Sequence, residues 1–271
     1  MQHFSETNSI PQADAGPEAW FAAQQAFFRA GLTRPLPFRQ RALRALRRAL
    51  TAHEQDLLRA LHQDLRKPAV EAYASELHFV LAEIDLALRH LPAWIRPEPR
   101  SVPWLDRPAR AAVRPEPKGV VLILGPWNYP CQLVFAPLVG ALVKPSSLAP
   151  ATGRVLEVVA AEAFLPEHCR VVAGDAGLGR RLLDCPWDHI FFTGSTRTGR
   201  EVMQAAAARL IPVTLELGGK NPCIVLPGTR LAAAADRIVW GKFMNAGQTC
   251  AAPDHVYAHA DVRDGLVAAL R

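Results

Sequence analysis

The sequence predicts an α/β protein in which helices cover both faces of a parallel sheet. From residue 119 onwards, short apolar runs rich in β-branched residues alternate with helical stretches, and this alternation is typical of a doubly wound sheet. Amphipathic helical patterns precede this part, and a proline-rich segment separates the two. Half of the 271 residues are hydrophobic, so the chain is long and apolar enough to bury a core.

Helices are expected at the start of the chain. Aromatic residues mark the first pattern at residues 20–28, and residues 43–65 supply the second. Within residues 77–91, leucine and isoleucine recur at spacings of three and four, which predicts a third helix. The polar residues 1–16 are expected to be disordered, and the repeated prolines of residues 96–118 predict an extended connector.

Strands and helices are then expected in alternation. The strand-like runs read as buried parallel strands and occupy residues 119–124, 169–175, 189–195 and 222–226. Helical patterns lie between them at residues 132–142, 154–163 and 197–210. Because ligands of such sheets bind beyond the carboxyl ends of the strands, a site is expected in the loops that follow the strands.

The net charge of +6 raises the question of a nucleic-acid or membrane partner. In the densest basic run, residues 38–50, leucines recur at helical spacing and arginines fill the positions between them. This pattern is typical of an amphipathic helix with a solvated basic face. We therefore expect no nucleic-acid partner, which would need a basic stripe with stacking aromatics. No apolar run reaches the roughly 20 residues needed to span a bilayer.

The five cysteines are expected to be free thiols. Their number is odd, no CxxC pair occurs, and the N-terminal residues lack the apolar region of a signal peptide. These features predict a reducing, cytoplasmic location. The cysteines and histidines also lack the spacing of metal ligands, so no metal site is expected.

Two loops after predicted strands contain candidate polar groups. Asn128, in GPWNYP, offers an amide donor suited to an oxyanion, and the alternative is an asparagine selected for turn geometry. Gly194 and Ser195 lie between a strand and the start of a helix, where backbone N–H groups attract phosphate. For Ser195 the alternative is a plain helix cap.

Glu216 and Cys250 are the candidates for a general base and a nucleophile. Glu216, in LELGGKNP, stands among apolar residues and glycines, a setting that can raise the pKa of a carboxylate. The alternative is that Glu216 pairs with a nearby cation, for example Lys220. Cys250 ends the stretch NAGQTC. An inert buried thiol is the alternative there, since no histidine near it in the sequence makes an obvious Cys–His pair.

Four motifs, taken in order, resemble those of the aldehyde dehydrogenase superfamily: GPWNYP, FTGSTRTG, LELGGKNP and GKFMNAGQTCAAPD. The N-terminal helices extend the resemblance to residues 17–271. Three N-terminal segments resemble the class 3-like branch of this superfamily, which includes fatty-aldehyde and coniferyl-aldehyde dehydrogenases. These segments are TRPLPFRQRALRALRRAL, DLRKPAVEAYASEL and VLAEIDLALRHLPAWI.

The resemblance implies a Rossmann-like sheet preceded by N-terminal helices and followed by the start of a truncated α/β catalytic domain. The N-terminal helices and dinucleotide-binding domain are expected at residues 17–212, and the catalytic domain is expected to begin at residues 213–271. The activity that it implies is oxidation of an aldehyde to a carboxylic acid with NAD or NADP.

In the implied mechanism, the Cys250 thiolate attacks the aldehyde carbon, and the Asn128 amide and the Cys250 backbone N–H hold the oxyanion. Hydride then passes to the nicotinamide, and Glu216 activates the water that hydrolyses the resulting thioester. The positions that match cofactor contacts of the family are Trp127, Lys144, Gly194, Ser195 and Gly218.

Two departures from the family pattern concern the cofactor. Between PLVGA and KPS only Leu142 and Val143 remain, about seven residues fewer than the family has for a turn and the start of a strand. Either the preceding helix loses about two turns or a strand of the sheet is lost, which puts the contact of Lys144 with the ribose in question. Ser147 replaces the family's acid, whose charge would oppose a 2′-phosphate, so both cofactors stay open.

A third departure is that family members continue well beyond the equivalent of residue 271, and the continuation includes their dimerisation arm. Residues 213–271 are therefore expected to leave apolar faces uncovered. Two alternatives to the dehydrogenase stay open. One is a non-catalytic truncated remnant with impaired cofactor binding, and the other is an enzyme that passes the thioester to coenzyme A, which Glu216 disfavours.

Overall fold

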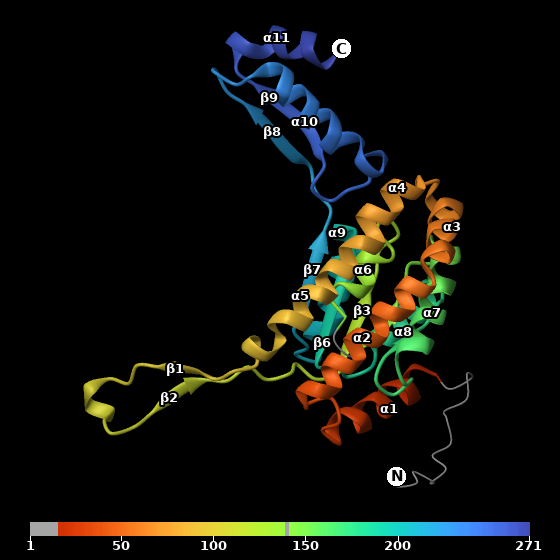
Figure 1. The fold of residues 1–271 in the computed structure, drawn as a ribbon, viewed down its shortest axis with the longest axis vertical. Helices are drawn as coiled ribbons and strands as arrows, with labels where there is room; N and C mark the ends of the chain where they lie inside the picture. The colour runs from red at the N-terminus through yellow and green to blue at the C-terminus, as the bar shows by residue number, and fades with distance from the viewer. Residues whose placement is uncertain (1–15, 139–140) are drawn as a thin grey trace.

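The computed structural model describes residues 16–138 and 141–271 and confirms the α/β fold with a parallel sheet (Figure 1). Five strands lie in the order β5-β4-β3-β6-β7, and all neighbouring pairs are parallel. Their bounds are Val121–Leu124 (β3), Ala141–Lys144 (β4), Arg170–Val171 (β5), His189–Gly194 (β6) and Val213–Leu217 (β7). The expectation of disorder for residues 1–16 concerns a segment that lies, except for Gly16, outside the described residues.

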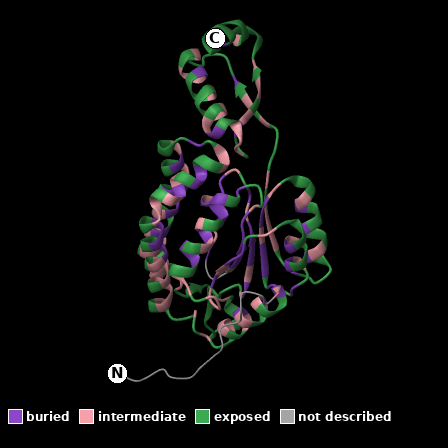
Figure 2. Cartoon of the chain, turned by 90° about the vertical axis from the view of Figure 1, so that its right-hand side faces the viewer, coloured by how far each residue is buried: buried purple, intermediate pink, exposed green. Residues whose placement is uncertain are grey.

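Helices cover both faces of this sheet, as the doubly wound pattern requires. Successive residues of a strand point to opposite faces, so Ile123 packs in one cluster with Val143, while Leu122 packs in the other with Leu142. The first cluster is covered by α2 (Leu36–Ala52), α3 (Glu54–Leu65), α5 (His78–Trp94) and α7 (Pro150–Ala163). The second is covered by α1 (Pro17–Arg29), α8 (Ala176–Leu183) and α9 (Thr196–Ala207). Figure 2 shows the buried residues concentrated in the sheet and the helices beside it.

The N-terminal section is helical, as predicted. It consists of α1 (Pro17–Arg29), α2 (Leu36–Ala52), α3 (Glu54–Leu65), α4 (Ala69–Ala72), a π-helical turn η1 (Tyr73–Leu77) and α5 (His78–Trp94). Residues 43–65, expected to form one helix, form two, because the chain turns at His53. The imidazole of His53 lies 3.1 Å from a carboxylate oxygen of Asp56 and 2.9 Å from one of Glu162 on α7.

The shortened segment before Lys144 keeps its strand and loses most of its helix. The predicted helix at residues 132–142 is only α6 (Gln132–Phe135), and β4 pairs in parallel register with β3. Because β4 lies between β3 and β5, loss of β4 would remove the backbone hydrogen bonds that both neighbouring strands make with it. A shorter helix loses only the hydrogen bonds of its own last turns. Of the two alternatives, the shortened helix is therefore confirmed.

The proline-rich connector contains a β-hairpin that the sequence did not reveal. β1 (Glu98–Arg100) pairs antiparallel with β2 (Ala111–Val113), and a 3-10 turn, η2 (Trp104–Asp106), lies between them. In Figure 1 this hairpin projects away from the sheet. All residues of β1 and β2 are exposed, so the hairpin has no apolar alternation that would have predicted strands.

The C-terminal residues form a second, smaller α/β unit above the carboxyl edge of the sheet (Figure 1). It contains β8 (Asn221–Val225), α10 (Leu231–Phe243), η3 (Met244–Gly247), β9 (Pro253–Ala258) and α11 (Ala260–Leu270), with β8 parallel to β9. The expectation of uncovered apolar surface is confirmed, since large apolar side chains of this unit are exposed: Ile224, Leu226, Val239, Trp240, Phe243 and Tyr257.

Within residues 16–138 and 141–271, no helix is both long enough and apolar enough to cross a bilayer. The basic run lies on α2, where leucines turn inward and arginines outward: Leu46 and Leu50 are buried, whereas Arg41, Arg44 and Arg48 are exposed. This arrangement agrees with a solvated basic face.

Candidate active site

The parallel sheet gathers the predicted site residues at one edge, because all five strands point the same way. β3 is followed by the loop of Trp127 and Asn128, β4 ends at Lys144, and β6 ends at Gly194. On β7, Glu216 lies opposite Thr193 of β6 in the ladder. This is the edge at which ligands of doubly wound sheets bind.

Hydrogen bonds join the Asn128 loop to the loop that carries Cys250, although the two are far apart in sequence. The side-chain Nδ2 of Asn128 donates to the carbonyl oxygen of Gln248 at 2.8 Å. The next residue in each loop repeats the connection, since the Tyr129 hydroxyl lies 2.6 Å from the Thr249 Oγ1. The structure therefore brings Asn128 and the NAGQTC stretch together.

Among the five cysteines, all of which lie in the described residues, Cys250 is exposed, Cys223 is partly buried, and the other three are buried. Its carbonyl oxygen accepts a hydrogen bond from Asn221 Nδ2 at 2.5 Å, which ties the cysteine to the start of β8. Burial raises the pKa of Cys131 well above its usual value and that of Cys185 to about 11. The alternative of an inert buried thiol fits those two cysteines and does not fit Cys250.

Glu216 lies in a more open setting than the sequence suggested. Its side chain is exposed at the end of β7, so the apolar surroundings inferred from its neighbours are not formed. Lys220, the cation suggested as its partner, instead pairs with Asp254, whose Oδ1 lies 3.0 Å from the Lys220 Nζ. Within the described part of the chain, no hydrogen bond joins Glu216 to Asn128 or Cys250.

Lys144 keeps its place at the carboxyl end of β4 despite the shortened segment before it. The side chain is buried, and its Nζ donates to the carbonyl oxygen of Pro145 at 3.2 Å. Burial lowers the pKa of Lys144, and the charge of Asp175 opposes that shift. The next helix, α7, is held in place by Asp64 of α3, which accepts the N–H groups of Ala151 and Thr152.

The remaining cofactor candidates surround the start of α9. Ser195 caps this helix, since its Oγ accepts the N–H of Thr198 at 3.2 Å, as its alternative interpretation predicted. Gly194 leaves no room for a side chain, because a Cβ there would lie 2.5 Å from the ring of Phe192. By contrast, a Cβ on Gly218 would meet nothing within 4 Å, and Trp127 is 37% exposed.

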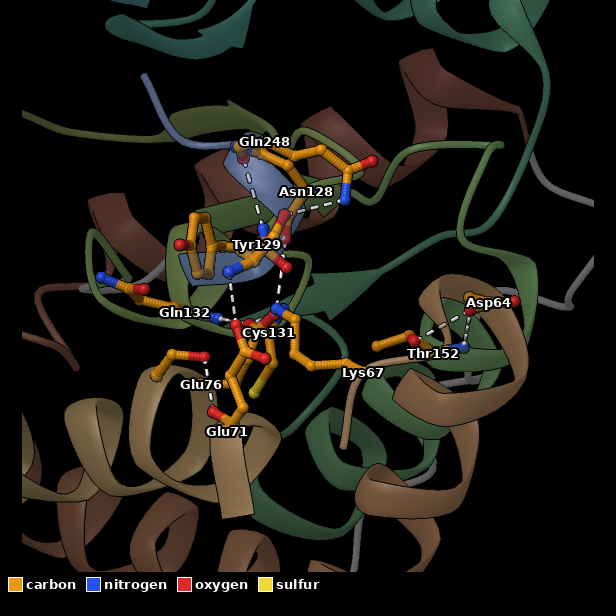
Figure 3. A network of polar contacts seen from close by, with 12 residues as sticks. Asp64, Lys67, Glu71, Glu76, Asn128, Tyr129, Cys131, Gln132, Thr152 and Gln248 are labelled. Atoms are coloured by element: carbon orange, nitrogen blue, oxygen red, sulfur yellow. Dashed lines mark hydrogen bonds and ion pairs between the residues drawn. The ribbon is translucent and has the colours of Figure 1, made fainter. Parts of the chain in front are cut away.

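Sequence reasoning missed four residues around the site. Three of them, Lys67, Glu71 and Glu76, are labelled in Figure 3, and the fourth is Asn245, whose side-chain amide donates to the Asn128 carbonyl oxygen. Glu76 precedes the buried Val80 and Ile84 by four and eight residues, so it lies on an apolar helix face. A charge on such a face is rarely left unpaired, and this signal could have found it.

In residues 16–138 and 141–271, no group of three or more His, Cys, Asp or Glu side chains could hold a metal ion.

The comparisons with known proteins agree with the motifs. The pattern that defines the aldehyde dehydrogenase family matches residues 5–271. Mouse aldehyde dehydrogenase family 3 member B2 is 42% identical, over 98% of this chain and 57% of its own. The dimeric, NADP-preferring aldehyde dehydrogenase of dog is 41% identical, over 91% of this chain and 56% of its own.

A solved structure shows the same fold. The substrate-bound state of Staphylococcus aureus AldH matches with a TM-score of 0.90 and 40% identity, over 93% of this chain and 57% of that one. The chain thus spans little more than half the length of the relatives it matches. The resemblance to the class 3-like branch, which was based on the motifs and the N-terminal helices, is confirmed.

Proposed function

Because the chain belongs to the aldehyde dehydrogenase family, we propose that it contributes an active site that oxidises an aldehyde to a carboxylic acid with NAD or NADP. The observation that supports this most directly is the contact between the Asn128 amide and the Cys250 loop. It supports the pairing of a candidate oxyanion donor with a candidate nucleophile two residues beyond Gln248, at the edge of the sheet where ligands bind.

Cys250 is the proposed nucleophile, and Asn128 is the proposed oxyanion donor. A side-chain amide has two N–H groups. One N–H of Asn128 is used on the Gln248 carbonyl, which fixes the plane of the amide and leaves the second N–H for a substrate oxygen. As the thiolate forms its C–S bond, the carbonyl oxygen gains negative charge, and this donor stabilises it.

Glu216 is the proposed base for the second half of the reaction. A thioester on Cys250 must be attacked by water, and a carboxylate that takes the proton makes the water a better nucleophile. The exposure of Glu216 at the carboxyl end of β7 gives it access to water. Hydrolysis releases the carboxylic acid and restores the thiolate. The presence of this base also disfavours transfer of the thioester to coenzyme A.

The residues at the sheet edge fit a dinucleotide. The buried ammonium of Lys144 lies there, Ser195 caps the 12-residue α9, and the space around Gly218 is open. Lys144 would hold the ribose, the first turn of α9 would face the phosphates, and Trp127, Gly194 and Gly218 would line the remaining surface. When bound, the nicotinamide supplies the acceptor for the substrate hydride.

Both cofactors remain within the proposal. Ser147 is exposed and uncharged at the position where an acid would disfavour a 2′-phosphate, and the relative from dog prefers NADP. A non-catalytic chain with impaired cofactor binding is the second candidate. The exposed apolar side chains of the C-terminal unit, such as Trp240 and Phe243, favour it, because a site is only as rigid as the elements that hold it.

Single-turnover kinetics test the proposal. The purified chain is mixed with a medium-chain aldehyde and with NAD+ or NADP+, and the absorbance at 340 nm is followed. We expect a burst of reduced cofactor in the wild-type protein and none in Cys250→Ser, while Cys223→Ser, which changes a partly buried cysteine, keeps the burst. Folded wild-type protein without a burst would support the non-catalytic candidate.

A further inference from the structure

A buried ion pair lies beneath the Asn128 loop. The Nζ of Lys67 is 2.7 Å from Glu76 Oε1, and the two side chains are 1% and 0% exposed. Glu76 lies in the π-helical turn η1, a local change of helical register that is frequent at functional sites. The ion pairs Arg47–Asp85 and Lys220–Asp254, by comparison, lie on the surface.

Glu76 holds the chain on the C-terminal side of the Asn128 loop. Its second oxygen, Oε2, accepts the N–H of Cys131 at 3.0 Å and the N–H of Gln132 at 2.9 Å. Both donors belong to the start of α6, three and four residues after Asn128. The carboxylate therefore uses one oxygen for Lys67 and the other for the backbone of the loop (Figure 3).

Lys67 holds the loop at Asn128 itself. Its Nζ donates to the Asn128 carbonyl oxygen at 3.2 Å and lies 4.4 Å from the centre of the Tyr129 ring. The same carbonyl oxygen accepts a second hydrogen bond, 2.9 Å long, from Asn245 Nδ2. Two donors at one carbonyl fix the orientation of the peptide group from which the Asn128 side chain projects.

Asn245 extends the network to the cysteine loop. Its backbone N–H donates to Glu71 Oε1, and its side-chain amide reaches the Gln248 carbonyl oxygen at 3.2 Å. That carbonyl also accepts the Asn128 amide. The segment from Lys67, in the link between α3 and α4, to Glu76 in η1 is thus connected to both loops of the candidate site.

We propose that Lys67 and Glu76 are positioning residues that orient the side-chain amide of Asn128 toward a substrate at Cys250. The inference rests on the proposed function of Asn128 as oxyanion donor. A buried charge pair is a poor way to add stability, since apolar residues of similar volume serve as well or better. The pair instead fixes the orientation of the loop that carries Asn128, because its remaining hydrogen bonds go to the backbone of that loop.

NMR of asparagine side chains tests this directly. The chain has only four asparagines, Asn8, Asn128, Asn221 and Asn245, so selective ¹⁵N-asparagine labelling gives few amide signals, and single substitutions assign them. The variants are Lys67→Met and Glu76→Gln. The matched controls are Asp85→Ala, which breaks a surface ion pair without adding an asparagine, and Leu57→Ala, which opens the core at a side chain that has no polar group.

We expect the Asn128 side-chain signals to move in both network variants and their hydrogen exchange to quicken at least about fivefold, with neither change in the controls. Unchanged Asn128 signals in both folded network variants would overturn the proposal, and so would an equal change in Leu57→Ala. If both network variants fail to fold, the wild-type chain decides. If the network is one unit, the side-chain amide hydrogens of Asn128 and Asn245 exchange with solvent through a single opening event, and their exchange rates depend on urea in the same way. Different urea dependences for the two side chains would contradict the proposal.

This readout is independent of catalysis. If Asn128→Ala keeps its activity while Lys67→Met moves the Asn128 amide, the positioning stands and the proposed function of Asn128 fails. Where the wild-type chain turns over aldehyde, Lys67→Met is expected to lower kcat with little change in KM. Equal losses in Leu57→Ala would contradict that.

Discussion

The cysteines of this chain differ mainly in how far water reaches them. Cys250 is exposed, whereas burial raises the pKa of Cys131 and Cys185. Because the thiolate is the reactive form, iodoacetamide at pH 8 is expected to alkylate Cys250 at least about tenfold faster than either buried cysteine. Peptide mapping after timed quenching measures this order. Faster labelling of Cys131 or Cys185 would contradict it.

The buried ion pair sets a second expectation for single residues. Removal of one partner leaves the other charge buried, so Lys67→Met should lower the free energy of unfolding by about 3–5 kcal/mol. Asp85→Asn breaks a pair whose side chains are 44% and 46% exposed, and it should cost no more than about 1 kcal/mol. Urea unfolding followed by circular dichroism compares the two. Equal losses would mean that the buried pair is not formed in solution.

The sequence predicted individual residues unevenly. Short motifs singled out Asn128 and Cys250 as candidates, and the structure joins their loops. The exposure of Glu216 and the contacts of Lys67 depend on which distant segments pack beside them. Such contacts, made by residues 61 positions apart in the case of Lys67 and Asn128, leave no trace in local spacing.

At the scale of elements, aromatic packing around His168 connects α1 and α2 to the segment after α7. The rings of Phe27, Phe38 and Phe164 lie 5.8, 5.0 and 5.3 Å from the His168 ring, centre to centre. This burial lowers the pKa of His168 to about 4 from 6.5. In the folded chain the imidazole is therefore neutral at pH values where the unfolded chain has protonated it.

This shift predicts how stability depends on pH. Between pH 6.5 and 4 the unfolded state binds the proton and the folded state does not, so stability is fully present above pH 6.5 and falls on acidification, by up to about 3 kcal/mol. His168→Phe should remove this part of the loss. Urea unfolding of both proteins at pH 7, 5.5 and 4.5 measures the difference, and parallel pH profiles would show that His168 does not contribute.

Elements with a buried face were predicted well, and the exposed ones were not. The burial of β3 and β6 on both faces follows from apolar runs that the sequence displays. The exposed hairpin of β1 and β2 has no such pattern. The sequence left open whether the helix before Lys144 is shortened or a strand is lost. The outcome, a short α6 and an intact β4, depends on neighbouring strands that are far away in the sequence.

At the scale of the whole molecule, the C-terminal unit exposes apolar surface that a folded protein usually covers. Trp240 is 69% exposed, whereas Trp187 is 2% exposed and packs edge-on against Phe21. We expect Trp240→Ser to reduce self-association, seen by light scattering over a concentration series, and to change stability by no more than about 0.5 kcal/mol. Trp187→Ser should instead cost about 3–5 kcal/mol. A loss of stability in Trp240→Ser as large as that in Trp187→Ser would show that Trp240 is buried in solution.

The proposed mechanism requires Cys250 to form a covalent intermediate with the aldehyde carbon. The most direct measurement is the mass of the Cys250 peptide after Glu216→Gln protein is incubated with aldehyde and NAD+ or NADP+, because loss of the proposed base should slow hydrolysis of the thioester. We predict an acyl adduct on Cys250 and none on Cys223. An unmodified Cys250 in folded protein that forms reduced cofactor would contradict the account.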